Sequence, residues 1–195
     1  VEHMAFNGTK NFAKHELIDY VQSIGMRFGA DLNAFTTFDE TVYTLTVPTD
    51  DPKILETGIR ILADWAGGIS FEGEEIDKER GVVLEERRLR LGASSRLLDK
   101  QLPVLLKGSR YAERIPIGKQ EVLESAPHEA FRRFYRTWYR PELMAVVAVG
   151  DFEVATMKAL VKRYLGDFRG TGEMPQRPSF LVPEHSETLF SIETD

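Results

Sequence analysis

The fold of this chain is decided by residues 26–47, which read MRFGADLNAFTTFDETVYTLTV. Apolar and polar residues alternate from Met26 to Ala34, a pattern typical of a half-buried strand. A polar turn at Asp39-Glu40 leads into a second strand, predicted over Thr41 to Val47. Because the connection is short, we expect the two strands to pair as an antiparallel hairpin.

Helical patterns flank this hairpin on both sides. Amphipathic spacing predicts helices over residues 13–24, 52–66, 74–90 and 93–106, from about 127, and over 153–165. A continuous apolar run from Leu143 to Val149 predicts a central strand. Helices and strands that mix without strict alternation indicate an α+β fold, a two-layer sandwich with helices packed on one face of a mainly antiparallel sheet.

Composition excludes several classes of function. The chain has 195 residues and a formal net charge of −6, which counts against a nucleic-acid partner because phosphate affinity comes from Lys and Arg. The absence of cysteine excludes disulfides, thiolate metal sites and cysteine nucleophiles. No apolar run is long enough to predict a transmembrane segment.

A first chemical clue lies at the start of the chain, where Glu2 directly precedes His3 in VEHMAFNGT, residues 1–9. This dipeptide matches the back half of the inverted zinc-peptidase motif H-x-x-E-H. Two His four residues apart lie about 40° apart around a helix of 3.6 residues per turn, so one face presents two ligands and a carboxylate base. By itself the dipeptide is common, and taken alone it favours a surface pair at the end of the chain.

A second clue is the pair Glu79 and Glu86, which are two helical turns apart and share a face with Val82 and Val83. A buried carboxylate is costly unless it is paired or bound to metal. The alternative is an exposed acidic face, and the spacing alone favours this alternative. Its partners would be the neighbouring arginines Arg87, Arg88 and Arg90.

Together, five ordered segments resemble the insulinase/pitrilysin family of zinc metallopeptidases. The segments are residues 1–9, 33–36, 41–43, 79–86 and 134–151, so the resemblance extends over about residues 1–168. No single segment is specific, but their order and spacing are.

The resemblance implies a role for six residues. His3 and Glu86 correspond to two ligands of one zinc ion, Glu2 to the general base that activates a water, and Glu79 to a residue that positions a ligand. Asn33 and Ala34 correspond to the strand that pairs with the substrate backbone. The implied activity is hydrolysis of peptide bonds in peptides or unfolded protein segments.

The chain departs from the family pattern at its start. The first His of the motif should lie two positions before Val1, and several strands should precede it. We therefore expect residues 1–169 to be a truncated N-terminal zinc-peptidase domain, and residues 170–195 a linker with the possible start of a second homologous domain. Such a fragment is expected to be inactive, to hold zinc weakly if at all, and to dimerise through an open sheet edge.

One alternative is a non-catalytic homologue that serves as a subunit or scaffold partner of an active peptidase. The presence of Glu2, His3, Glu79 and Glu86 favours the enzyme. The compartment is unknown from the sequence, although the motif around Asn7 resembles those of bacterial envelope members.

Overall fold

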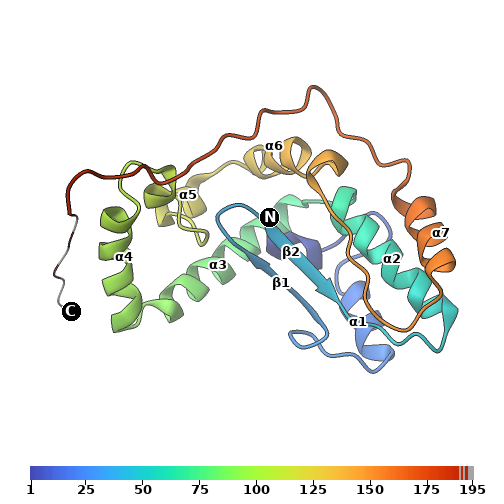
Figure 1. Cartoon of the computed structure of the whole chain (residues 1–195). Coiled ribbons are helices and arrows are strands. Elements are labelled where there is room, and N and C mark those ends of the chain that lie inside the picture. Colours follow the sequence, from blue (N-terminus) through green and yellow to red (C-terminus); the bar gives the residue numbers. More distant parts are fainter. Residues whose placement is uncertain (189, 191, 193–195) are drawn as a thin grey trace. The chain divides into compact units, whose positions relative to one another are not determined.

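The structure is a computed structural model that describes residues 1–188, 190 and 192 (Figure 1). It divides the chain into two compact units. The first comprises Val1–Thr36, Thr41–Ile76 and Pro127–Pro175. The second comprises Thr37–Glu40, Asp77–Ala126 and the described residues from Gln176 onward.

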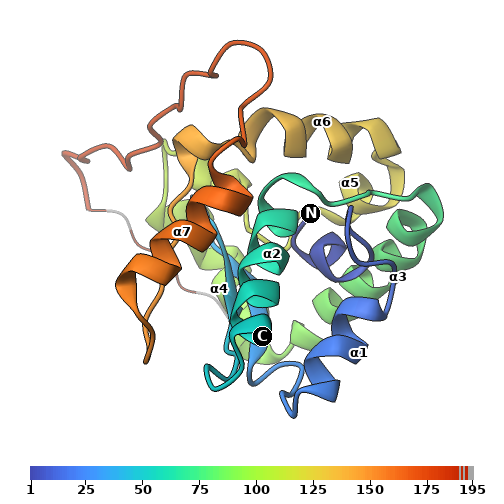
Figure 2. The same cartoon turned by 90° about the vertical axis from the view of Figure 1, so that its right-hand side faces the viewer.

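The first unit combines helices with a two-stranded antiparallel sheet. Its elements are η1 (Glu2–Phe6), α1 (Glu16–Ser23), β1 (Leu32–Thr36), β2 (Thr41–Leu45), α2 (Pro52–Gly67), the first turn of α3 (Gly73–Arg90), α6 (His128–Trp138), η3 (Pro141–Leu143) and α7 (Val154–Leu165). Register pairs Leu32 with Leu45 and Thr36 with Thr41. Helices α2 and α7 lie side by side (Figures 1 and 2), and the Arg163 guanidinium donates to the Glu56 carboxylate at 2.8 Å between them.

Local signals set the limits of α2. Asp51 caps its start by accepting a hydrogen bond from the Lys53 backbone N–H at 2.8 Å, and Pro52 occupies the first helical position. The helix ends at Gly67, as its sequence predicts.

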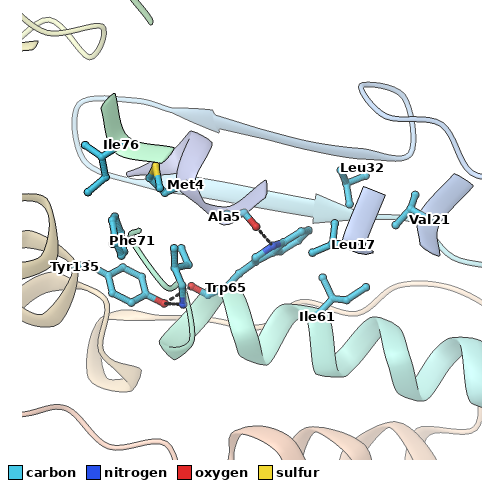
Figure 3. Close-up of a cluster of buried hydrophobic side chains, with 11 residues drawn as sticks. Met4, Ala5, Leu17, Val21, Leu32, Ile61, Trp65, Phe71, Ile76 and Tyr135 are labelled. Atoms are coloured by element: carbon cyan, nitrogen blue, oxygen red, sulfur yellow. Dashed lines mark hydrogen bonds between the residues drawn. The ribbon is translucent and has the colours of Figure 1, made fainter. Parts of the chain in front are cut away.

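The core of the first unit forms around Trp65 of α2 (Figure 3). Trp65, Leu32, Ile61 and Val21 are the largest fully buried side chains among the described residues. Fully burying a side chain of this kind stabilises the fold by roughly 1.5–3 kcal/mol. Helix α6 adds Tyr135, whose hydroxyl donates to the Trp65 carbonyl oxygen at 2.8 Å.

The second unit contains the rest of α3, then α4 (Ala93–Leu105), η2 (Arg110–Glu113) and α5 (Gln120–Ser125). Among its described residues, only Ser109 is buried. Polar contacts therefore carry much of its cohesion. The Arg80 guanidinium donates to the carbonyl oxygens of Leu123 and Ala126, and Arg87 donates to that of Gly118 at 3.2 Å.

The prediction of an α+β fold is confirmed in coarse form, as a mainly helical structure with a small antiparallel sheet. The strand predicted from Met26 was wrong over its first half, and β1 begins at Leu32. A turn replaces it, because Arg27 N–H donates to Asp31 Oδ2 at 2.9 Å and Gly29, at a φ of +87°, donates to the Leu32 carbonyl oxygen.

The central strand predicted over Leu143 to Val149 was also wrong. Residues 141–143 form η3 and residues 144–149 form no strand, with Val147 and Val149 largely exposed. An apolar run becomes a strand only where a neighbouring strand pairs with its backbone, and no described segment does so.

Two further predictions concern a strand near the end of the chain and helices that could cross a membrane. The sequence also allows the last dozen residues to begin another strand. None is present in residues 184–188, 190 and 192, and the remaining positions lie outside the described residues. None of the helices in the described ranges combines the length and the apolar character that a bilayer crossing needs. Helix α5 was not predicted.

Candidate active site

Glu2 and His3 lie side by side on η1, a 3₁₀ turn rather than the end of an α-helix. Both are half-buried, while Met4 and Ala5 are fully buried behind them. Trp65 Nε1 donates to the Ala5 carbonyl oxygen at 3.0 Å (Figure 3), and Asn7 Nδ2 donates to that of His3 at 3.1 Å. The turn is therefore fixed from its buried side.

The hairpin of β1 and β2 places a hydroxyl against the Glu2 carboxylate. Thr36, the last residue of β1, donates a short hydrogen bond from Oγ1 to Glu2 Oε2. The Thr36 and Thr41 hydroxyl oxygens lie 3.2 Å apart, across the last pair of the hairpin. Glu2 is thus joined to a strand that lies more than thirty residues away in sequence.

Two half-buried phenols lie near the same carboxylate. The hydroxyls of Tyr43 and Tyr139 are 2.8 Å apart. Burial raises the pKa of Tyr43 far above its ordinary value, and the charge of Glu2 adds to this shift. Burial also raises the pKa of Tyr139, again with a contribution from Glu2. Both phenols are thus close enough to Glu2 for its charge to raise their pKa values.

Asn33 and Ala34 lie on β1 as the sequence predicts. In the part of the chain that the structure describes, β2 is the only strand that pairs with β1. Asn33 Oδ1 accepts a hydrogen bond from the Ala34 backbone N–H at 2.9 Å. A peptide that adds to the other edge of β1 would use such backbone groups.

Glu79 and Glu86 lie half-buried on α3 in the second unit. Glu86 forms an ion pair with Arg90, one turn further on. A shallow groove runs along this helix, and Val82 and Leu89 are 50% and 72% exposed on either side of Glu86. The ion pair agrees with the alternative of an arginine-paired acidic face, and single exposed apolar residues are ordinary on such a face.

The six residues are divided between the units. Glu2, His3, Asn33 and Ala34 belong to the first unit, and Glu79 and Glu86 to the second. Within either unit, the described residues include no group of three His, Asp or Glu side chains placed to hold a metal ion. In donor chemistry, the His3 imidazole and the Glu86 carboxylate fit zinc, as two of the three protein ligands that a catalytic zinc uses.

The sequence did not identify Thr36, Tyr43 and Tyr139 as neighbours of Glu2. Thr36 and Tyr43 stand inside segments that resemble the family, and an alternation of period two places both on the face of the hairpin that carries Leu32. Their link to Glu2 depends on how η1 packs against the hairpin, which no spacing in the sequence reveals.

Known proteins resemble this chain in sequence and in fold. Residues 1–102 match the profile of insulinase (peptidase family M16), and residues 125–195 match that of the peptidase M16 inactive domain. A zinc protease PQQL-like protein of Arabidopsis thaliana is 44% identical over 192 residues, which cover 98% of this chain and 20% of that protein. The chain thus spans about a fifth of the length of the curated relatives it matches first.

Two solved structures share the fold. The first half of the periplasmic protease PqqL from Escherichia coli gives a TM-score of 0.86 at 35% identity, over 95% of this chain and 39% of that one. A mutant of the ferredoxin protease FusC, in complex with Arabidopsis ferredoxin, gives 0.83 at 26% identity, over 93% and 20%. With a profile match over more than half of its residues and these relatives beside it, the chain belongs to the insulinase family of peptidases, family M16.

Proposed function

We propose that the protein to which this chain contributes is a zinc-dependent endopeptidase that hydrolyses peptide bonds in peptides or unfolded protein segments. The observation that carries the proposal is the placement of Glu2 and His3 together on a half-buried turn, with the Glu2 carboxylate held at the end of β1. A base, a metal donor and a strand edge for the substrate are thereby combined in one unit.

In this proposal His3 and Glu86 hold the zinc ion together with a further donor, and Glu79 positions a ligand. Zinc supplies Lewis acidity, which lowers the pKa of a coordinated water to about 7. Glu2 takes the proton from the attacking water at one carboxylate oxygen. It then holds that proton close to the scissile bond, where the leaving amine can receive it.

The substrate is proposed to bind as an added strand. The backbone of Asn33 and Ala34 pairs with the peptide and fixes its direction, and side-chain preferences are left to pockets elsewhere. Ferredoxin bound to the FusC relative supports a polypeptide substrate for this chain's protein as well.

We further propose that β1 and β2 form part of a larger antiparallel sheet with helices on one face, and that residues 1–169 and 170–195 belong to successive domains.

A non-catalytic partner subunit is the second candidate. It is favoured by the match of residues 125–195 to a domain described as inactive. The two candidates differ in one respect that can be measured, which is hydrolysis that depends on Glu2.

The test is a peptidase assay on the intact protein with an unstructured reporter peptide. We expect a chelator to abolish hydrolysis and zinc to restore it. Glu2→Gln should lower kcat by roughly 10²–10⁴-fold, the range for loss of a general base, without loss of zinc. Glu121→Gln, an exposed change on α5, is the matched control and should leave kcat unchanged. Hydrolysis that survives both the chelator and Glu2→Gln would refute the enzyme.

A further inference from the structure

The hydroxyl of Thr36 contacts the Glu2 carboxylate directly. Its Oγ1 donates to Glu2 Oε2, and the same oxygen lies 3.2 Å from Thr41 Oγ1. The two threonines are opposite each other in the last pair of the hairpin. Three oxygen-bearing side chains therefore form a continuous hydrogen-bonded row.

The direction of the hydrogen bonds in this row follows from proton counting. An ionised carboxylate can only accept, and a threonine hydroxyl carries one proton. The Thr36 proton is therefore directed at Glu2, so Thr41 must be the donor in the contact between the two threonines. Thr41 orients the Thr36 hydroxyl, which in turn orients the carboxylate.

The backbone of the hairpin restricts where these hydroxyls can lie. Threonine is β-branched and its χ1 angle is restricted, so each hydroxyl is placed by the backbone of its strand. Two residues after Thr41, on the same face of β2, Tyr43 is joined to Tyr139 at 2.8 Å. In contrast, a glutamate side chain has several rotatable bonds and loses considerable freedom when it is held in one geometry.

We propose that Thr36 is a positioning residue for Glu2, supported by Thr41. It fixes the carboxylate through Oε2 and leaves Oε1 to accept the proton of the attacking water. This inference rests on the proposed peptidase function. It assigns to Thr36 a role that the strand-edge residues Asn33 and Ala34 do not have, because they are placed to meet the substrate backbone.

The first test compares three variants of the intact protein in the peptidase assay. Thr36→Val keeps the β-branched shape and removes the hydroxyl, and it should lower kcat by roughly 10–100-fold, as expected for a misplaced catalytic group. KM and zinc content should stay unchanged, and the melting temperature should fall only by the few degrees that the lost hydrogen bond accounts for. Thr36→Ser retains the hydroxyl and should restore most of kcat. Thr46→Val, an exposed threonine just after β2, is the matched control and should behave as wild type.

The second test needs no catalysis. A double-mutant cycle of Glu2→Ala and Thr36→Val in urea unfolding of the chain of residues 1–195 measures the contact itself. A hydrogen bond to a charged group should appear as a coupling of about 10-fold in the folding equilibrium constant. Additive effects would show that the contact is absent, and the inference would then be wrong.

The outcomes separate this inference from the proposed function. If the wild-type protein hydrolyses no peptide, the peptidase proposal and the positioning role both fail. If the wild type is active and Thr36→Val has the same kcat, only the positioning role fails. A loss of kcat that Thr36→Ser does not restore would point to altered packing and would also overturn it.

Discussion

The hydroxyls of Tyr43 and Tyr139 lie 2.8 Å apart, and this contact joins β2 to the residue that follows α6. Burial raises the pKa of Tyr43, with further contributions from Tyr139 and Glu2. A phenol with a raised pKa binds its proton more tightly in the folded chain than in the unfolded one. Its contribution to stability is therefore fully present below about pH 10, the ordinary tyrosine value, and is lost as the pH rises above it.

We expect the free energy of unfolding to fall above about pH 10, by up to roughly 1.4 kcal/mol per pH unit for each such phenol. Tyr43→Phe should reduce this slope, and at neutral pH it should cost about 1 kcal/mol for the lost hydrogen bond. Urea unfolding across the alkaline range measures both quantities. An unchanged slope in Tyr43→Phe would contradict a buried phenol at this position.

Asp64 anchors the loop that follows η1. Its carboxylate is buried on α2 and accepts from the Thr9 hydroxyl at 2.6 Å, from the Asn11 backbone N–H at 2.9 Å and from Asn11 Nδ2 at 2.6 Å. Asp64→Ala leaves these donors without their acceptor and should cost about 3 kcal/mol in urea unfolding. Asp19→Ala, an exposed change on α1, should stay within about 0.5 kcal/mol. Equal effects of the two variants would show that the loop is not held through Asp64.

Zinc binding by the chain of residues 1–195 should be weak, because His3 and Glu86 supply two of the three protein donors that catalytic zinc takes. Titration with zinc, followed by metal analysis after gel filtration, measures the affinity. His3→Ala should weaken it further, whereas His185→Ala should not, since His185 Nε2 lies 3.1 Å from the Lys107 carbonyl oxygen and is engaged there. Tight, stoichiometric zinc that survives His3→Ala would show that other residues bind it.

Sequence patterns predicted the helices and strands whose limits are set by residues close to them in sequence. The Asp51 cap, Pro52 and the closing glycines define α2 within a few residues, and the structure confirms the helix. The alternation of apolar and polar residues wrongly predicted a strand over Met26 to Asp31. A turn with Gly29 at positive φ can carry the same apolar spacing as a strand. The apolar run before Gly150 shows the same limit, since a strand requires a partner that composition does not supply.

The residues of the candidate site fall into the same two groups, those that a sequence pattern can identify and those that it cannot. Glu2, His3, Glu79 and Glu86 could be singled out because their spacing along the chain resembles a family pattern, and their roles remain predictions. Thr36, Asp64 and Arg140 could not be singled out, because each acts through a contact with a residue remote in sequence or with backbone carbonyls. Polar residues of this kind look like ordinary surface positions until the packing that buries or pairs them is known.

Arg140 occupies the space where a side chain at Gly170 would stand. It is 3% exposed, and its guanidinium donates to the carbonyl oxygens of Glu173 at 2.9 Å and Thr171 at 3.3 Å. A Cβ at Gly170 would lie 2.5 Å from Arg140 Nη2. Because the guanidinium is buried and held by these carbonyls, it cannot withdraw without losing them.

Replacement by alanine should therefore change the free energy of unfolding in opposite directions at two glycines. Gly170→Ala should destabilise the chain by about 1–3 kcal/mol through overpacking. Gly81→Ala should stabilise it by about 0.5–1 kcal/mol, because Gly81 lies within α3, where an added Cβ meets nothing within 4 Å and alanine favours the helix. Urea unfolding of both variants tests the pair. A stabilising Gly170→Ala would mean that the Arg140 guanidinium lies elsewhere, and that the segment after α7 is held to the first unit by other contacts.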